Sequence, residues 1–363
     1  MRNRKNKSII IRFDADENIG IGHFNRCYAL GESFKEQGFE IIYCCRYFDK
    51  SIRDLLIKSK SKYFFIPKKL SWEKEAEYIL SKATVSSCAI ILDISNSYIL
   101  ENISGIALYL KKLRKEYLVI LIDGMKGNAL LTKKNLKTDV AIVPYFGAEG
   151  LKMQEMGSNL FLTGPKYFVF KPEYSSLKAG RRSVRKLANK ILITLGGADP
   201  RGTTAKVLKG ISGINDRKVH ARVVSGPCFS SALRNRIKRF QKDSCHKLDI
   251  VDSPKSLLKH MLWCDVAITS SGLTKYELAM AGTPSLQISF NNDCADVNKP
   301  FEKNKCAKHL GVHNDVSSDL IARETVKLLD DDKQRRLMSK AGQKLLDGQG
   351  AKRIVDSIRR RLK

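Results

Sequence analysis

Short apolar runs alternate with longer amphipathic stretches along almost the whole chain, and this alternation restricts the fold more than any other feature. It is typical of βαβ units, in which helices connect parallel strands and cover the sheet. The first half predicts strands near residues 9–13, 40–45, 63–66, 88–93, 117–123 and 140–143. Helices are expected between them, for instance at 23–37 and 100–115, and the first of these has a stripe of apolar residues at helical spacing.

A second series of the same kind begins after a polar and basic segment, residues 178–190, which we interpret as a linker. It predicts strands near residues 191–195, 219–224, 248–251, 266–269 and 285–288, with helices that include 203–211 and 273–281. The 363 residues suit two domains. We therefore expect an α/β protein with two Rossmann-like, doubly wound domains that share a ligand cleft. The expected parts are residues 1–180, residues 188–345 and a basic C-terminal helix, 346–363.

Positive charge is the unusual feature of the composition. Hydrophobic residues make up 43% of the chain, enough for two cores, but the formal net charge is +29. Such a field favours anionic partners. The Lys and Arg residues are spread along the chain without a nucleic-acid-binding motif, so we attribute most of the charge to a solvated surface or a basic proteome and expect no nucleic acid as a partner. For the basic end of the chain we prefer helices packed on the domains, and keep contact with an anionic membrane as the alternative.

Several features indicate a cytoplasmic protein. No apolar stretch approaches the ~20 residues of a membrane span, and the run at residues 9–11 is too short for a signal peptide. The nine cysteines include no C-x-x-C pair and most lie in apolar runs. We therefore interpret them as buried thiols, neither disulfides nor zinc ligands.

The first candidate site follows the first predicted strand. Gly20 and Gly22 let the backbone approach a ligand, and a helix that opens near His23 presents free N–H groups to an anion. The pair of glycines alone is a weak signal. A helix N-terminus disfavours a cation, so the imidazole of His23 should be neutral and able to accept a proton. A helix-capping or core histidine is the alternative.

The second candidate is a glycine turn after the strand at residues 191–195. Gly196 and Gly197 are followed by Asp199, a candidate helix cap, and by Pro200, which suits a first helical turn. A diphosphate could lie against this turn. Plain turn chemistry is the alternative.

The third candidate is a strand, a run of small residues and a helix. Ser270, Ser271 and Thr274, around Gly272 and Leu273, form a phosphate nest with their backbone N–H groups. Glu277 lies one turn into the helix, where its carboxylate can accept hydrogen bonds from two ribose hydroxyls. A capping box of Thr274 and Glu277 is the alternative.

The fourth candidate follows the strand at residues 285–288. Asn292 or Asp293 could contact a sugar there. A loop cap is the alternative.

These segments together resemble the UDP-sugar hydrolase family of pseudaminic acid biosynthesis and its spore-coat polysaccharide relatives. The resemblance runs from about residue 9 to residue 358. Its most specific part is Arg12-x-Asp14 followed by Gly20-x-Gly22-His23-x-x-Arg26-Cys27. The further matching segments are residues 164–167, 195–200, 270–277 and 346–351. The family is similar in fold to GT-B glycosyltransferases.

The resemblance implies metal-independent hydrolysis. We also expect a monomer without a cofactor. The histidine that matches His23 helps water to attack the anomeric carbon of a UDP-linked diacetamido-trideoxy hexose, and UDP departs. The second domain holds UDP, with Glu277 on the ribose. The implied substrate-binding residues are Arg12, Asp14, Gly20, Gly22, Arg26, Gly196, Gly197, Ser270, Ser271, Gly272, Leu273, Thr274, Glu277 and Asn292.

The chain departs from the family pattern at four places. These are Asp93-Ile94-Ser95, Asp123-Gly124, residues 170–173 and Asn292-Asp293. We expect all four segments to face the sugar. The departures therefore affect the prediction of which sugar is carried and of whether water is the acceptor. A glycosyltransferase of the same architecture and a non-catalytic nucleotide-sugar-binding protein are the alternative functions.

Overall fold

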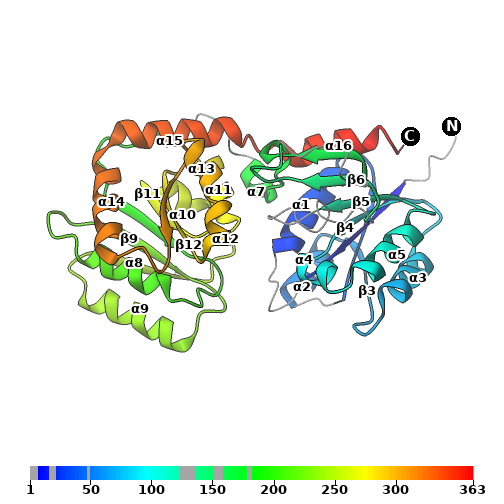
Figure 1. Ribbon diagram of the computed structural model, residues 1–363, viewed down its shortest axis with the longest axis horizontal. Helices are drawn as coiled ribbons and strands as arrows, with labels where there is room; N and C mark the ends of the chain where they lie inside the picture. The colour runs from blue at the N-terminus through cyan, green and yellow to red at the C-terminus, as the bar shows by residue number, and fades with distance from the viewer. Residues whose placement is uncertain are drawn as a thin grey trace. The chain divides into compact units, whose positions relative to one another are not determined.

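A computed structural model describes residues 7–15, 22–46, 50–122, 136–149, 158–175, 177 and 182–362. The chain divides into two units (Figure 1). The first unit comprises residues 1–172 together with residues 348–363, and the second comprises residues 173–347.

The first unit is built on a parallel seven-stranded sheet in the order β3-β2-β1-β4-β5-β6-β7. Its strands are β1 Ser8–Phe13, β2 Glu40–Cys45, β3 Lys62–Phe65, β4 Ser87–Asp93, β5 Leu118–Ile122, β6 Thr138–Val143 and β7 Ser158–Thr163. Its helices are α1 Gly22–Lys35, α2 Lys50–Lys58, α3 Trp72–Lys82, α4 Asn96–Glu101, α5 Ile103–Leu113, the 3-10 helix η2 Pro165–Tyr167 and α16 Gly350–Arg359. The short helix α7 Pro172–Ser175 begins at the last residue of this unit's first segment and continues into the second unit.

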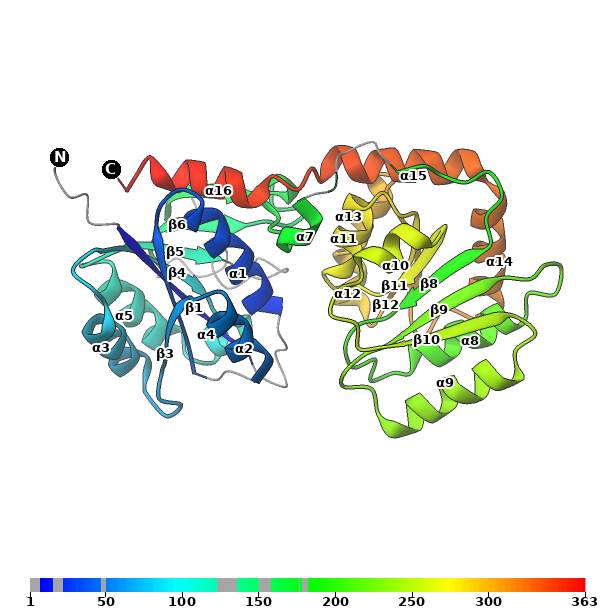
Figure 2. The same cartoon turned by 180° about the vertical axis from the view of Figure 1, so that it is seen from behind.

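Helices cover both faces of this sheet (Figure 2). Alternate side chains of a strand point to opposite faces, so Ile9 and Ile11 pack with α1, α2 and α16, whereas Ile10 packs with α3 and α5. The strands are therefore apolar on both faces. This explains why they appear in the sequence as continuous apolar runs.

The second unit has a parallel six-stranded sheet in the order β10-β9-β8-β11-β12-β13. Its strands are β8 Lys190–Thr194, β9 His220–Ser225, β10 Lys247–Asp252, β11 Val266–Thr269, β12 Ser285–Ser289 and β13 Lys308–Val312. Its helices are α8 Thr203–Ser212, α9 Ser231–Asp243, α10 Leu258–Trp263, α11 Thr274–Met280, α12 Asn292–Asp296, α13 Lys299–Lys303, α14 Ser318–Asp330 and α15 Asp332–Leu345. One core gathers the apolar side chains of α8, α9 and α14 against this sheet.

The last helix of the chain returns to the first unit. Ile354, Val355 and Ile358 of α16 are buried in the same core as α1. Gly350 lies against the backbone of Phe168, where a Cβ atom would clash with the carbonyl group. The described residues contain no helix that is both long and apolar enough to cross a membrane.

The sheet order places a topological switch point in each unit. In the first unit the order reverses between β1 and β4, and in the second between β8 and β11. The chain leaves two such neighbouring strands in opposite directions, which opens a crevice at their carboxyl ends where α/β sheets bind ligands. Each of these four strands contains a residue of the candidate sites described below or is followed by one.

The observed elements differ from the predicted ones in three respects. The edge strands β7 and β13 were not predicted, and the predicted helix 100–115 is two helices, because the Asn102 side chain caps α5 by accepting a hydrogen bond from the Gly105 N–H at 2.9 Å. Part of the predicted linker lies outside the described residues. Within it, Arg182 donates to the Met261 carbonyl at 2.8 Å and Arg185 to Asp265 at 2.7 Å, so this stretch is anchored on the second unit.

Candidate functional site

His23 and Asp93 form a hydrogen-bonded pair at the switch point of the first unit. His23 lies in the first turn of α1, and its Nδ1 is 2.6 Å from Oδ1 of Asp93, the last residue of β4. The Asp93 side chain is fully buried, whereas that of His23 is 21% exposed. In the neutral tautomer whose Nδ1–H donates to Asp93, Nε2 carries the lone pair. The arrangement leaves one ring nitrogen able to accept a proton.

Arg26 holds Asp93 from the other side. Its Nε is 2.8 Å from Oδ2 and its Nη2 is 2.6 Å from Oδ1, a two-pronged contact. Burial would raise the pKa of Asp93, but the charges and hydrogen bonds of Arg26 and His23 outweigh burial and keep this pKa well below its ordinary value. Asp93 therefore stays ionised at neutral pH.

The contacts of Arg26 and Asp93 differ from those that the sequence suggested. Arg26 was expected to touch the substrate, but its guanidinium is bound to Asp93 and to the Tyr145 hydroxyl and is 9% exposed, so it positions Asp93. Asp93 was recognised only as a departure from the family motif, and its pairing with His23 was missed. The signal that could have found it is an aspartate at the carboxyl end of the strand beside β1.

Arg12 and Asp14 were also expected to contact the substrate, but the structure buries both side chains. The two side chains are 0% and 4% exposed and form an ion pair with each other. Arg12 Nε also donates to Glu75 Oε1 at 2.9 Å, and Asp14 Oδ2 accepts the Ser95 N–H at 2.8 Å. The pair braces β1 against α3 and the segment after β4. It lies inside the unit because each charge is balanced there.

The glycines of the first candidate can be placed only in part. Gly22 is the first residue of α1, one position before His23. Gly20 lies outside the described residues, as do the other residues between 16 and 21. Asp123 and Gly124 also lie outside them.

In the second unit the glycine turn lies beside the predicted nest. Thr194 of β8 pairs with Thr269 of β11, so the residues after these strands are neighbours. Gly196 has a φ of +96°, and a Cβ atom there would be 3.8 Å from Ser270 Oγ. Gly197 accepts the Cys228 N–H at 2.9 Å through its carbonyl oxygen. The second and third candidate segments therefore form one site.

The Asp199 carboxylate, a candidate helix cap, accepts hydrogen bonds from the first two N–H groups of α8. It accepts the Thr203 N–H at 2.9 Å and the Thr204 N–H at 2.7 Å. The helix begins at Thr203, with Gly202 as its cap, and Pro200 lies in the preceding turn. The predicted helix at 203–211 is confirmed, but Pro200 does not lie in its first turn. The first backbone N–H groups of α8 are therefore hydrogen-bonded within the chain.

The nest itself is a set of small residues at the start of α11. Ser270 and Ser271 are each 4% exposed, and a Cβ atom on Gly272 would meet no atom within 4 Å. Leu273 caps α11 without a side-chain hydrogen bond, so the capping box of Thr274 and Glu277 is not formed at this helix start. The hydroxyl of Thr274 is therefore not used as a cap.

Glu277 and Asn292 were both expected to touch the substrate. Glu277 lies in α11 and is hydrogen-bonded by the buried Tyr174 hydroxyl, whose pKa is raised chiefly by burial and then by the charge of Glu277. Asn292 is exposed in the first turn of α12. The cap of that helix is the neighbouring Asn291, which accepts the Cys294 N–H at 2.9 Å.

Sequence reasoning missed a buried polar network beneath the nest. Lys275 donates to Asn298 Oδ1 at 3.0 Å, and Asn298 Nδ2 donates to Ser271 Oγ at 3.0 Å and to Ser289 Oγ at 2.9 Å. Ser289 also contacts His309 Nε2 at 2.8 Å. No sequence pattern identifies these residues, because a lysine in the first turn of a helix is usually exposed.

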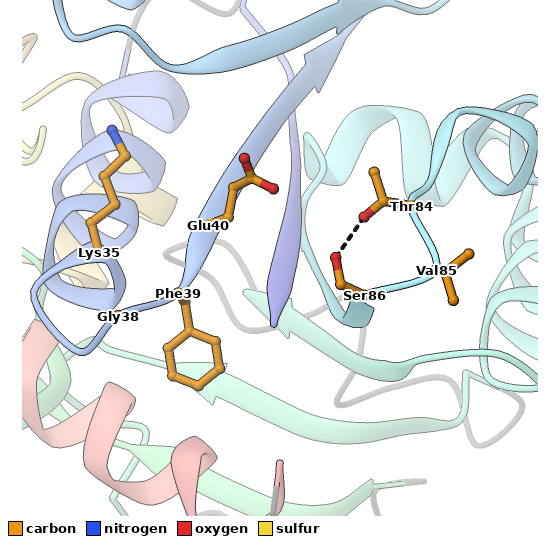
Figure 3. A pocket seen from close by; sticks show the side chains of 7 residues that line it. All are labelled: Lys35, Gly38, Phe39, Glu40, Thr84, Val85 and Ser86. Carbon is orange, nitrogen blue, oxygen red and sulfur yellow. Dashed lines mark hydrogen bonds between the residues drawn. The ribbon is translucent and has the colours of Figure 1, made fainter. Parts of the chain in front are cut away.

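Two further features were considered as sites. No group of three or more His, Cys, Asp or Glu side chains within the described ranges could hold a metal ion. A hollow at the opposite, amino-terminal edge of the first sheet is shown in Figure 3, where Thr84 and Ser86 are hydrogen-bonded to each other. The lining residues are Lys35, Gly38, Phe39, Glu40, Thr84, Val85 and Ser86. None of them belongs to the segments described above.

Comparison with protein-family models finds no match. Two curated proteins are similar to the chain. An uncharacterized protein of Methanocaldococcus jannaschii is 28% identical over 273 residues, 67% of this chain and 54% of that protein, so the match spans about half the relative's length. The spore coat polysaccharide biosynthesis protein SpsG of Bacillus subtilis is 24% identical over 251 residues, 68% of this chain and 71% of that protein.

Similar solved structures extend over nearly the whole chain. MurG of Acinetobacter baumannii superposes with a TM-score of 0.68 at 14% identity, over 98% of this chain and 99% of that one. LpCGTa, solved in complex with UDP, has a TM-score of 0.66 at 12% identity, over 98% of this chain and 99% of that one. These likenesses show the fold: two Rossmann-like parallel-sheet units that match GT-B glycosyltransferase structures.

Proposed function

We propose that this chain is a hydrolase that releases a deoxy-amino sugar from UDP for surface polysaccharide or nonulosonic acid biosynthesis. The observation that carries the proposal is the His23–Asp93 pair, which presents a partly exposed imidazole at the switch point of the first unit. The similarity to the spore coat protein SpsG supports a role in polysaccharide synthesis. The likeness to proteins solved with UDP or UDP-glucose supports the substrate class.

His23 would act as the general base. Its Nε2 takes a proton from water as the water oxygen attacks the anomeric carbon, and the bond from that carbon to the diphosphate oxygen breaks. Asp93 fixes the tautomer through Nδ1 and stabilises the imidazolium that forms, as the carboxylate does in a catalytic triad. Arg26 keeps Asp93 ionised and in place. General-base help of this kind typically accelerates a reaction by roughly 10²–10⁴-fold.

The second unit would hold the leaving group. Backbone N–H groups and hydroxyls around Ser270, Ser271 and Thr274 would bind the diphosphate, which becomes more negative as the bond breaks. Gly272 leaves open space for close approach. Glu277, held by Tyr174, would accept hydrogen bonds from the ribose hydroxyls. In this proposal Arg12 and Asp14 brace the first unit and touch no substrate.

Glycosyl transfer by the same residues is the second candidate. The similar solved structures include a glycosyltransferase of Rickettsia africae and the calicheamicin glycosyltransferase CalG4, with TM-scores of 0.63 and 0.61. In a transferase an acceptor hydroxyl replaces water, and His23 would deprotonate it. The two functions differ only in the nucleophile.

One experiment separates the nucleophiles. The protein is incubated with a panel of UDP-sugars in H₂¹⁸O without an acceptor, and the products are analysed by mass spectrometry. Hydrolysis at the anomeric carbon places ¹⁸O in the free sugar and none in UDP. Label in UDP would show attack on phosphorus and contradict the mechanism. UDP-sugar that binds but stays intact until an acceptor is added would identify a transferase.

A further inference from the structure

Lys275 is a buried cation without a buried counter-charge. Its side chain is fully buried, and Nζ donates to the Val297 carbonyl oxygen at 2.7 Å and to Asn298 Oδ1 at 3.0 Å. Both acceptors are neutral. Among the side chains that the structure describes, no carboxylate forms an ion pair with this amine. The ring of Phe301, 5.0 Å from Nζ, adds only a weak attraction.

A lysine in such surroundings is poised between its two protonation states. Removing an ammonium from water without a partner of opposite charge is costly, so burial favours the neutral amine. Burial accordingly lowers the pKa of Lys275 to about 7, with a smaller opposing effect from Cys294. An anion brought nearby would shift the balance towards the ammonium.

The hydrogen bonds of Lys275 lead to the nest. Asn298 accepts from the amine and donates to Ser271 Oγ, so one side-chain amide separates the charge from the second residue of the nest. Ser271 Oγ in turn donates to Ser289 Oγ at 3.3 Å. This chain of hydrogen bonds holds the Ser271 hydroxyl in one orientation. Lys275 is therefore connected to the nest through hydrogen bonds.

Two buried side chains next to the network have unused hydrogen-bonding capacity. The Gln287 amide is fully buried, and neither its oxygen nor its nitrogen has a hydrogen-bond partner in the described structure. Thr269, its neighbour across the sheet, also has an unpaired buried hydroxyl. Buried polar groups in native proteins are nearly always hydrogen-bonded to protein or to ordered water. The region beneath the nest is therefore polar.

We propose that Lys275 is a positioning residue whose ammonium balances a diphosphate bound at the Ser270–Thr274 nest, and that binding is coupled to proton uptake by its amine. This inference rests on the proposed function, since it takes the ligand to be a nucleoside diphosphate or its sugar ester. The proton comes from the buffer and protonates Nζ, and no bond of the ligand changes. Lys275 acts through Asn298 and Ser271 and does not touch the ligand.

Other titratable groups near Lys275 must be separated from it. They are the Cys294 thiol on α12 and the His309 imidazole on β13. Burial is the main cause that lowers the pKa of His309; Glu302 opposes it, and Lys275 and Lys299 add to it. His309 could therefore also take up a proton when an anion binds. Only a variant at position 275 assigns the proton.

The test is calorimetric titration with UDP-glucose, whose diphosphate has no ionisation near neutral pH, and with UDP. All proteins carry His23→Ala, so that cleavage does not interfere. Titrations at pH 7 in two buffers with different ionisation enthalpies count the protons taken up, and a series from pH 6 to 8.5 measures affinity. Three proteins are compared: the His23→Ala chain, the same chain with Lys275→Met, and the same chain with Lys308→Met. Lys308 is a partly exposed lysine paired with Glu324.

With Lys275 present, we expect uptake of about half a proton per UDP-glucose at pH 7, because a group with a pKa of about 7 is half charged beforehand. Affinity should fall about tenfold from pH 6 to pH 8.5. Lys275→Met should bind about tenfold more weakly at pH 6, take up no proton and show no such fall. Lys308→Met should behave like the His23→Ala parent.

Three outcomes would overturn the inference. Proton uptake that persists in Lys275→Met would assign the proton to another group, such as His309. Binding without uptake in the parent would show that Lys275 keeps one charge state. If neither ligand binds the parent, the proposed function fails together with this inference, whereas the first two outcomes leave the proposed function intact.

Discussion

Nδ1 of His23 and Oδ1 of Asp93 are 2.6 Å apart although the two residues are 70 positions apart in the sequence. The contact joins the first turn of α1 to the carboxyl end of β4, the two places that flank the switch point of the first sheet. Because Asp93 is also held by Arg26, the imidazole is oriented by a carboxylate that cannot move away. Each part of this arrangement can be tested.

Asp93→Asn should lower kcat by about 10²–10⁴-fold, because an amide cannot hold the imidazole tautomer or stabilise the imidazolium. The same change leaves the buried Arg26 charge unbalanced, so we expect thermal unfolding several degrees lower. Turnover of the UDP-sugar and melting are measured together. Asp249→Asn is the matched control, since Asp249 pairs with His220 at 2.6 Å in the second unit, and it should retain turnover. A fully active Asp93→Asn protein would remove Asp93 from the mechanism.

Acid should destabilise the first unit through Glu75 and Asp93. Burial would raise the pKa of Glu75, but Arg12 and Arg46 outweigh it and lower the pKa. A carboxylate with a lowered folded pKa contributes stability above its unfolded value, about 4.3 for Glu, and this contribution is lost as the pH falls through the folded value. Urea unfolding from pH 7 to pH 3 measures it. Glu75→Gln should make the free energy of unfolding depend less on pH. An unchanged pH dependence would contradict the assigned ion pairs.

The last helix should stabilise the first unit. Ile354 is fully buried in the core that contains α1, so Ile354→Ala should cost about 2–5 kcal/mol. Hydrogen exchange resolved by peptide measures where protection is lost. We expect hydrogen exchange to become faster in α1 and β1 and to stay unchanged in β8 and β9. The exposed Lys352→Ala is the control. Equal loss of protection in both units would contradict the assignment of α16.

Glu277 should discriminate ribose from deoxyribose. If its carboxylate binds the ribose hydroxyls, UDP should bind more tightly than 2′-deoxy-UDP. Glu277→Gln should weaken the binding of UDP about tenfold and reduce the difference in affinity between the two nucleotides. Fluorescence or calorimetric titration of both nucleotides gives the four affinities. Lys308→Met serves again as the control. An unchanged preference in Glu277→Gln would place the ribose elsewhere.

The central strands could be predicted from the sequence because they are apolar on both faces. β1 and β11 are almost fully buried, and each contains an apolar run, Ile9–Ile11 and Val266–Ile268. β7 and β13 were missed. Both have half-exposed residues, and β13 contains Gly311 beside a register shift. Their edge position is not the reason, because the edge strands β3 and β10 were predicted.

The site divides in the same way. His23 and the nest could be identified because their signals are local: a glycine and polar segment between a strand and a helix. Asp93 and Lys275 could not, since their roles depend on strand order and on burial. Arg12 and Asp14 belong to a specific motif, but the motif does not predict that both side chains are buried inside the unit.

The most direct measurement of the central claim compares turnover with nucleotide binding in His23→Ala. His220→Ala is the matched control: that imidazole is 20% exposed and lies 2.6 Å from an aspartate, as His23 does, but it is at the start of β9. We predict that His23→Ala loses about 10²–10⁴-fold in kcat for UDP-sugar cleavage and binds UDP normally, whereas His220→Ala retains both. Full turnover in His23→Ala, or equal losses in the two variants, would contradict the account.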